Sequence, residues 1–329
     1  MAPGPDGFRP LPGFLQQQLA QIPELQDASM PRIEVIEFNP VIDSSNMTPE
    51  HWMKLARMIH QNLDAFDGFV VLHGTDTLAY TASALPFMLE GLDRPVILTG
   101  SQLPLSEVRN DARENLKTSI LLAADERISE VGIFFGDQLL RGCRSIKSSA
   151  VSFHAFDSPN YPPLAEAGTR IVVYPSRLRP AAQGSRRLHS IHPIEMATFR
   201  LFPGLSVPVL ENVLQRPLKA LILESYGDGN GPAQDASFLT AIRRAVDGGT
   251  VIVNCSQCRH GAVSQSNYET GTVLARAGVV SGYDLTIEAA VAKLMFLFSQ
   301  HDSVDEVKRL MVTDLVGELT VPAEEKVSF

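Results

Sequence analysis

The stretch HGTDT, residues 73–77, places an imidazole, two hydroxyls and a carboxylate directly after the apolar run Phe69–Leu72. A threonine hydroxyl can serve as a nucleophile when a base takes its proton, and a lysine oriented by a carboxylate can be that base. Thr75, Asp76 and Lys147 supply these three groups. The sequence leaves open whether Lys147 meets the other two, because a lysine on the surface is the alternative.

Other catalytic signatures are missing from the sequence. It contains no GxGxxG or GxxxxGK[ST] motif for a nucleotide, no GxSxG elbow and no histidine pair at metal-ligand spacing. Cys255 and Cys258 form a C-x-x-C motif, with only His260 nearby as a further zinc ligand. Because an apolar strand pattern runs into this motif, we interpret these residues and Cys143 as reduced, structural thiols.

Composition and charge narrow the possible partners. With 44% hydrophobic and 20% charged residues, the 329-residue chain is typical of a globular protein. A formal net charge of −9 argues against broad nucleic-acid binding, which needs a basic surface. No apolar run approaches the roughly 18 residues of a membrane span, and residues 1–6 do not resemble a signal peptide. We expect a cytoplasmic protein with no nucleic-acid partner and no membrane partner.

The elements that would position these groups alternate along the chain. Short, continuously apolar runs are typical of strands covered on both faces, so they favour an α/β fold with parallel strands. A segment rich in Pro, Gly and Arg around residues 177–193 interrupts the pattern and predicts a linker. We predict strands at Phe69–Leu72, Val96–Leu98, Val131–Phe135, Ala220–Leu223 and Val251–Val253, a strand-like segment at Glu34–Phe38, and helices at 77–89, 112–124, 233–246 and 286–298.

Polar clusters follow several of these strands. Ligands of parallel α/β sheets bind beyond the carboxyl ends of the strands, where helix N-termini favour an anion such as a carboxylate. Taken singly, Ser44, Thr75, Asp76 and Thr77 each favour helix capping over a functional role. Their accumulation at one sheet edge is what favours a site. The clusters are DSSN at 43–46, HGTDT at 73–77, TGSQ at 99–102, GDQ at 136–138 and ESYGDGNG at 224–231.

These motifs resemble a known family, the bacterial-type L-asparaginases, and within it the cytoplasmic type I enzymes. HGTDT, ILTGSQ, RNDARENL, RGCRSIK and YGDGNGP match in order and spacing, and the similarity extends from Gly7 to about Leu319. The resemblance implies hydrolysis of L-asparagine to L-aspartate and ammonia, without metal or cofactor, by dimers or dimers of dimers. It also implies a larger N-terminal α/β domain with a mixed or parallel sheet (1–178), a linker (179–196) and a smaller parallel C-terminal α/β domain (197–329).

The resemblance assigns three catalytic residues. Thr75, Asp76 and Lys147 match the Thr-Asp-Lys triad of the family. Lys147 would accept a proton from Thr75 or from the attacking water. Asp76 would also bind the α-ammonium group of the substrate.

Four further positions match substrate-binding residues of the family. Ser44 and Ser45 correspond to residues that hold the α-carboxylate. Ser101 corresponds to a position whose backbone faces the side-chain amide. Asn230 corresponds to an asparagine that reaches the site of the neighbouring subunit, which implies an intimate homodimer.

The sequence departs from the family pattern in three places. Family members begin with a strand and a GGT turn whose threonine is the first nucleophile, and this sequence starts after that turn. We expect a misplaced start or a clipped N-terminus rather than a natural pseudoenzyme, and little or no turnover by the chain as written. Phe8 stands near the family's flexible-loop tyrosine, and Ile146 stands where some type I enzymes have a threonine beside a regulatory site.

Two other functions compete with the amidohydrolase. A catalytically inactive protein that binds asparagine or aspartate would retain the binding residues and release no ammonia. A tRNA-dependent amidotransferase subunit has a similar core, but it needs an extra N-terminal domain and a tRNA-binding surface. The acidic balance and the short N-terminus of this sequence argue against that third function.

Overall fold

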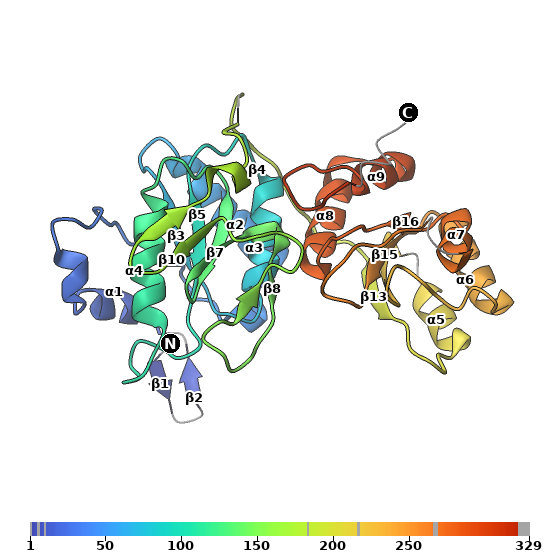
Figure 1. Cartoon of the computed structure of the whole chain (residues 1–329), viewed down its shortest axis with the longest axis horizontal. Coiled ribbons are helices and arrows are strands. Elements are labelled where there is room, and N and C mark those ends of the chain that lie inside the picture. The colour runs from blue at the N-terminus through green and yellow to red at the C-terminus, as the bar shows by residue number, and fades with distance from the viewer. Residues whose placement is uncertain are drawn as a thin grey trace. The chain divides into compact units, whose positions relative to one another are not determined.

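The structure, a computed structural model, describes residues 2–4, 7–9, 11–182, 184–215, 218–265 and 269–321. The chain divides into two units, Met1–His189 and Ser190–Phe329, drawn from blue to green and from yellow to red in Figure 1. None of the described helices is long and apolar enough to cross a membrane. The exact residue bounds of the two domains and of the linker stay a prediction.

The first unit is built around a six-stranded mixed sheet in the order β11-β10-β7-β6-β5-β3. Strands β3, β5 and β6 are parallel, whereas β7, β10 and β11 pair antiparallel. Every residue of β5 and β6 is buried, which explains their continuously apolar sequences. The mixed α/β sheet expected for the N-terminal part is confirmed. The strands are Phe69–Leu72 (β3), Val96–Thr99 (β5), Val131–Phe135 (β6), Gln138–Arg141 (β7), Ala165–Ala167 (β10) and Ile171–Val173 (β11).

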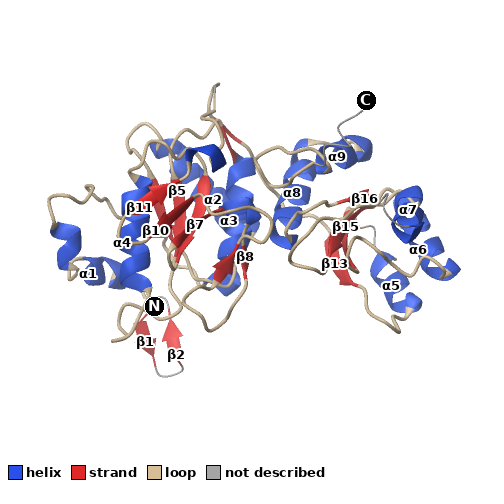
Figure 2. Ribbon diagram, in the orientation of Figure 1, coloured by secondary structure: helices blue, strands red, loops and turns tan. Residues whose placement is uncertain are grey.

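Helices and short strands complete the first unit (Figure 2). Helices α3 and α4 confirm the helices predicted from apolar periodicity, and Leu122 of α4 packs with Ile97 and Phe134 of the sheet. The helices are Phe14–Leu19 (α1), Pro49–Asn62 (α2), Leu78–Met88 (α3) and Ala112–Ala123 (α4). The short strands form the pairs Ala2–Gly4 (β1) with Gly7–Arg9 (β2), Leu89–Glu90 (β4) with Arg187–Leu188 (β12), and Ile146–Lys147 (β8) with Phe156–Asp157 (β9).

The strand predicted at Glu34–Phe38 is wrong. Residues 31–38 form neither helix nor strand, and Ile33 and Ile36 remain exposed. An extended segment becomes a stable strand only when a neighbour completes its ladder of backbone hydrogen bonds. Within the described residues β3 ends the sheet and pairs only with β5, so it does not serve as that neighbour.

The second unit contains a parallel sheet in the order β13-β14-β15-β16, as expected for the C-terminal part. Its strands are Met196–Arg200 (β13), Ala220–Ser225 (β14), Val251–Ser256 (β15) and Val280–Ser281 (β16). The helices are Val207–Leu214 (α5), Ala236–Asp247 (α6), Glu269–Arg276 (α7), Ile287–Gln300 (α8) and Val304–Met311 (α9).

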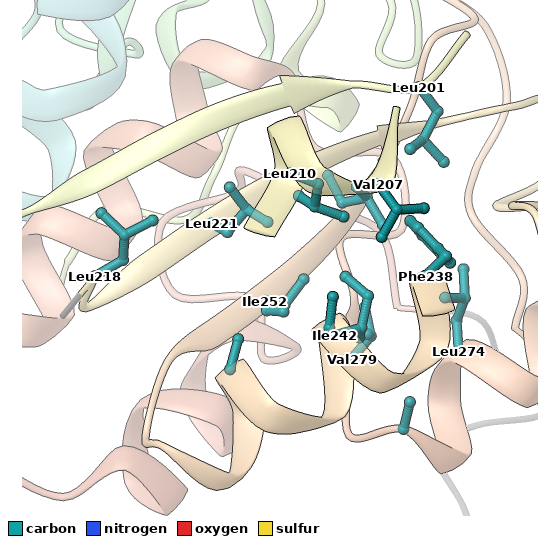
Figure 3. Packing of buried hydrophobic residues seen from close by; sticks show 14 residues of the cluster. Leu201, Val207, Leu210, Leu218, Leu221, Phe238, Ile242, Ile252, Leu274 and Val279 are labelled. Atoms are coloured by element: carbon teal, nitrogen blue, oxygen red, sulfur yellow. The ribbon is translucent and has the colours of Figure 1, made fainter. Parts of the chain in front are cut away.

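Side chains of β14 and β15 alternate between two apolar cores. Leu221 and Ile252 pack with Phe238 of α6 in the core that Figure 3 shows in close view. Ile222 and Val253 belong to the other core, with α8 and α9. Because both faces are covered, apolar residues occupy consecutive positions in these strands.

Candidate active site

The three residues expected to form a triad meet beyond the carboxyl end of β3. Thr75 and Asp76 lie in the loop between β3 and α3, and Lys147 is the last residue of β8. The Nζ atom of Lys147 lies 2.9 Å from Oγ1 of Thr75 and 2.7 Å from Oδ1 of Asp76. The structure therefore brings one ammonium group into hydrogen-bond contact with both the hydroxyl and the carboxylate.

The three side chains differ in exposure. The Lys147 side chain is 22% exposed and that of Asp76 is 63% exposed, whereas Thr75 is half-buried. A hydrogen bond between an ammonium and a carboxylate is charge-assisted and orients both groups. Because Asp76 is mostly exposed, the carboxylate can hold Lys147 and still contact a ligand.

Ser44 lies against the loop that carries Thr75. It is 5% exposed and begins the short 3-10 turn Ser44–Asn46. A Cβ atom added to Gly74 would lie 2.5 Å from Oγ of Ser44, so only glycine fits between the two segments without a shift. The hydroxyl of Thr77 donates to the Ser44 carbonyl at 2.7 Å. Thr77 occupies the N-cap position of α3 but binds this turn instead of capping the helix.

Ser45 follows on the same turn and is exposed. Its hydroxyl donates to Oδ1 of Asp43 at 3.0 Å, and its backbone N–H donates to the same oxygen at 3.1 Å. The carboxylate of Asp43 therefore shapes this turn from within. The structure thus places Ser44 beside the loop of Thr75, with Ser45 next to it on the same turn.

A second loop, residues 100–103 after β5, also borders Thr75. Gln102 was not among the residues predicted for the site, although it belongs to the TGSQ cluster that contains Ser101. Its Oε1 atom lies 3.5 Å from the Thr75 hydroxyl, and its Nε2 atom lies 3.4 Å from the Ser149 carbonyl. Ser101 precedes it directly and is half-buried. The accumulation of polar residues at a strand end was the signal that could have identified Gln102.

Buried polar residues of the RNDARENL motif hold this second loop. Asp111 is 7% exposed, and its carboxylate accepts the backbone N–H groups of Gln102 and Leu103 at 3.0 to 3.1 Å. Asn115 is 1% exposed and donates to the Gly100 carbonyl at 3.0 Å. These contacts explain why a polar motif occurs on α4, next to the sheet.

Asn230, the last of the predicted site residues, belongs to the second unit. It follows β14, and its backbone N–H donates to the Tyr226 carbonyl at 2.8 Å. Its Oδ1 atom accepts a hydrogen bond from the hydroxyl of Thr270. The amide of Asn230 therefore has a defined orientation within its own unit.

The other residues considered in the sequence analysis are the three cysteines, Ile146 and Phe8. Cys143 and Cys255 are buried and Cys258 is exposed, all three as free thiols, and burial raises the pKa of the Cys255 thiol to about 12. Ile146 begins β8. The side chain of Phe8 lies outside what the structure describes. Among the described residues, no group of three or more His, Cys, Asp or Glu side chains could hold a metal ion.

Comparisons with known proteins cover both units. The family model of the asparaginase N-terminal domain matches residues 10–179, and that of the glutaminase/asparaginase C-terminal domain matches residues 195–311. L-asparaginase 1 of Escherichia coli (strain K12) is 47% identical over 314 residues, 95% of this chain and 93% of that protein. The 60 kDa lysophospholipase of Mus musculus is 43% identical over 293 residues, 88% of this chain but 52% of that protein.

A solved structure gives the same result for the fold. The crystal structure of L-asparaginase I from Vibrio cholerae O1 biovar eltor str. N16961 superposes with a TM-score of 0.89 at 45% identity, covering 94% of each chain. Together with the family models, this likeness confirms the resemblance seen in the sequence and the two-domain fold. The chain belongs to the asparaginase family.

Proposed function

We propose that this protein hydrolyses the side-chain amide of L-asparagine, giving L-aspartate and ammonia. The observation that carries the proposal is the contact of Lys147 Nζ with both Oγ1 of Thr75 and Oδ1 of Asp76, at 2.9 and 2.7 Å. It occurs in a chain that is 47% identical to a protein named L-asparaginase 1. Amide hydrolysis needs an activated oxygen nucleophile, and a lysine beside a hydroxyl can provide it.

Lys147 is the proposed base and Asp76 its partner. Only the neutral amine can accept a proton, either from Thr75 or from an attacking water, so the ammonium must first lose one. Asp76 accepts a hydrogen bond from Lys147 at 2.7 Å and thereby orients it. When the α-ammonium group of a substrate binds Asp76, it shares that carboxylate with Lys147.

The α-carboxylate of the substrate is assigned to the turn of Ser44 and Ser45. This turn contacts the Thr75 loop through Gly74 and Thr77, so both ends of a small amino acid can be held by adjacent segments. Ser101, in the neighbouring loop, is assigned to the side-chain amide through its backbone. Asn230 is assigned to the site of a second subunit, so the proposal includes a homodimer or a dimer of dimers in the cytoplasm.

The test is ammonia release from L-asparagine by protein purified from its native source, with the N-terminus that its host provides. Thr75→Val and Lys147→Met, introduced at the chromosomal locus, are each expected to lower kcat/KM by about a thousandfold or more. Lys117→Met is the matched control, because Lys117 of α4 pairs with Glu114 of the same helix and with Glu24 instead of with Thr75. Its activity should equal that of the unsubstituted protein.

Three outcomes separate the alternatives. Undiminished ammonia release in both site variants would remove Thr75 and Lys147 from the mechanism. Calorimetric binding of L-asparagine without ammonia release would instead support a binding protein. Light scattering of the purified protein tests the subunit arrangement, and a monomer that remains fully active would contradict the role of Asn230.

A further inference from the structure

His73 opens the HGTDT motif, and the proposed hydrolysis gives it no role. Its backbone N–H extends the strand pairing to the Thr99 carbonyl at 2.9 Å. Its ring Nδ1 lies 2.6 Å from the Gly74 carbonyl oxygen, and its Nε2 lies 2.9 Å from Oγ1 of Thr81. Both ring nitrogens are therefore engaged immediately before the candidate catalytic residues.

The Thr81 hydroxyl continues the contacts of His73 into the core. Thr81 lies on α3 with no exposed surface, and it accepts the indole N–H of Trp52 on α2 at 3.0 Å. Trp52 is itself 5% exposed. A row of hydrogen bonds, buried at Trp52 and Thr81 and open to solvent at Gly74, thus joins two helices to the loop of Thr75.

The chemistry of these groups determines which of them donate and which accept in this row of hydrogen bonds. An indole N–H only donates and a carbonyl only accepts. Because Thr81 already accepts from Trp52, its own proton is free to be donated to Nε2 of His73. The proton of His73 then belongs on Nδ1, where it meets the Gly74 carbonyl. This is one defined tautomer of neutral imidazole.

The surroundings of the ring agree with a neutral state. Burial lowers the pKa of His73, and the hydrogen bond to the Gly74 carbonyl opposes this shift only in part. The two groups hydrogen-bonded to the ring, the Gly74 carbonyl and the Thr81 hydroxyl, are both uncharged. A lowered pKa keeps a histidine uncharged through the neutral pH range.

Gly74 shows why such a ring would be needed. Ser44 packs so closely on Gly74 that a side chain there would collide, yet glycine has the most conformational freedom of any residue. That freedom lies directly before Thr75. Since the peptide bond is planar and trans, fixing the Gly74 carbonyl also fixes the direction of the Thr75 N–H.

We propose that His73, as the neutral Nδ1–H tautomer set by Thr81 and Trp52, is a positioning residue that fixes the Gly74–Thr75 peptide for catalysis. The inference rests on the proposed hydrolysis for its effect on rate. Its structural part, the tautomer and the held peptide, is independent of turnover.

The tautomer is tested directly by nitrogen NMR of protein labelled in its histidines. The expected His73 signal is that of neutral imidazole with hydrogen on Nδ1, unchanged where ordinary histidines titrate, near a pKa of about 6.5. Thr81→Val should disturb this signal. A ring protonated on Nε2, or one that titrates at the ordinary value, would overturn the proposal.

The effect on rate is tested with two substitutions of one residue. His73→Leu removes both ring contacts, whereas His73→Asn keeps an N–H donor near the position of Nδ1. His73→Leu is expected to lower kcat about 10- to 30-fold, the size of one lost hydrogen bond, with KM for L-asparagine changed less than about threefold. His73→Asn should recover most of the loss. Equal kcat in all three proteins would contradict positioning.

A matched control separates positioning from general damage to the core. Thr81→Val should lower kcat, whereas Thr250→Val should not. Like Thr81, Thr250 is a buried threonine whose hydroxyl makes a hydrogen bond, here donated to the Leu218 carbonyl at 2.9 Å. It lies in the second unit. If the unsubstituted protein releases no ammonia, the proposed function fails. The tautomer and the amide signals of Thr75 and Asp76 in His73→Leu and His73→Asn then decide the role of His73.

Discussion

Among the lysine–carboxylate pairs of the described residues, Lys147–Asp76 and Lys293–Glu318 are of nearly equal length but lie in opposite surroundings. Lys147 and Asp76 lie 2.7 Å apart, with side chains 22% and 63% exposed. Lys293 and Glu318 lie 2.6 Å apart, and neither has any exposed surface. The same two charges thus occur once at an open loop and once inside the second unit.

The other hydrogen bonds of Lys293 and Glu318 occupy the groups that could otherwise bind a ligand. Lys293 also donates to the carbonyls of Met311 and Thr313, at 3.0 and 2.6 Å. Glu318 accepts the backbone N–H groups of Leu315 and Val316. This pair therefore organises the chain after α9, whereas the exposed Asp76 keeps room to bind another group. Burial and hydrogen-bond saturation, rather than the charges, distinguish a structural pair from a candidate catalytic one.

The largest expected effect comes from breaking the buried pair. Lys293→Met leaves the Glu318 carboxylate charged and buried without its partner, which should lower the free energy of unfolding by about 3–5 kcal/mol. Urea denaturation measures the loss. The double variant Lys293→Met/Glu318→Gln should recover more than half of it, because glutamine keeps the acceptor for Leu315 and Val316 without the charge. A single variant as stable as the original would show that the pair contributes nothing.

An intermediate effect is expected at the glycine that separates the two segments of the candidate site. Gly74→Ala places a Cβ atom 2.5 Å from Oγ of Ser44 and forces the turn to move, at a cost of about 1–3 kcal/mol in the free energy of unfolding. KM for L-asparagine should rise, because the displaced turn carries the proposed carboxylate site. Gly168→Ala is the control, since a Cβ at Gly168 meets no atom within 4 Å. Equal KM values in both variants would argue against the assignment of Ser44.

The smallest effect on stability is expected at the exposed pair. Lys147→Met should change the free energy of unfolding by less than about 1 kcal/mol, as is usual for pairs near the surface. Thermal unfolding of Lys147→Met beside Lys117→Met measures this difference. A loss as large as that of Lys293→Met would show that Lys147 and Asp76 form a structural pair, as Lys293 and Glu318 do.

Local patterns predicted much of the fold. Continuous apolar runs identified β3, β5, β6, β14 and β15. For β5, β6, β14 and β15 the reason is that a strand covered on both faces is apolar at consecutive positions, whereas β3 is only partly buried. The strand-like segment Glu34–Phe38 did not become a strand, because no neighbouring strand among the described residues completes its ladder. A strand-like pattern shows that a strand is possible, and only a partner strand makes it one.

The candidate site divides in the same way. HGTDT and TGSQ could be located at strand ends from the sequence, and so could Thr75 and Asp76 as a hydroxyl and a carboxylate side by side. The contact of Lys147 with Thr75 spans 72 positions and follows from no local pattern. Gln102 as a neighbour of Thr75 and the row from Trp52 to His73 likewise appear only once α2, α3 and the loops are packed together.

By itself, the sequence determined strands β3, β5, β6, β14 and β15, helices α3, α4, α6 and α8, the asparaginase resemblance and the residue types available for chemistry. These depend on side-chain periodicity and motifs within a few residues, which the chain carries without folding. Only the tertiary structure decided that Lys147 pairs with the exposed carboxylate of Asp76 and that Lys293 is buried with Glu318. Burial and charge pairing arise from segments distant in sequence, so neither is encoded at any single position.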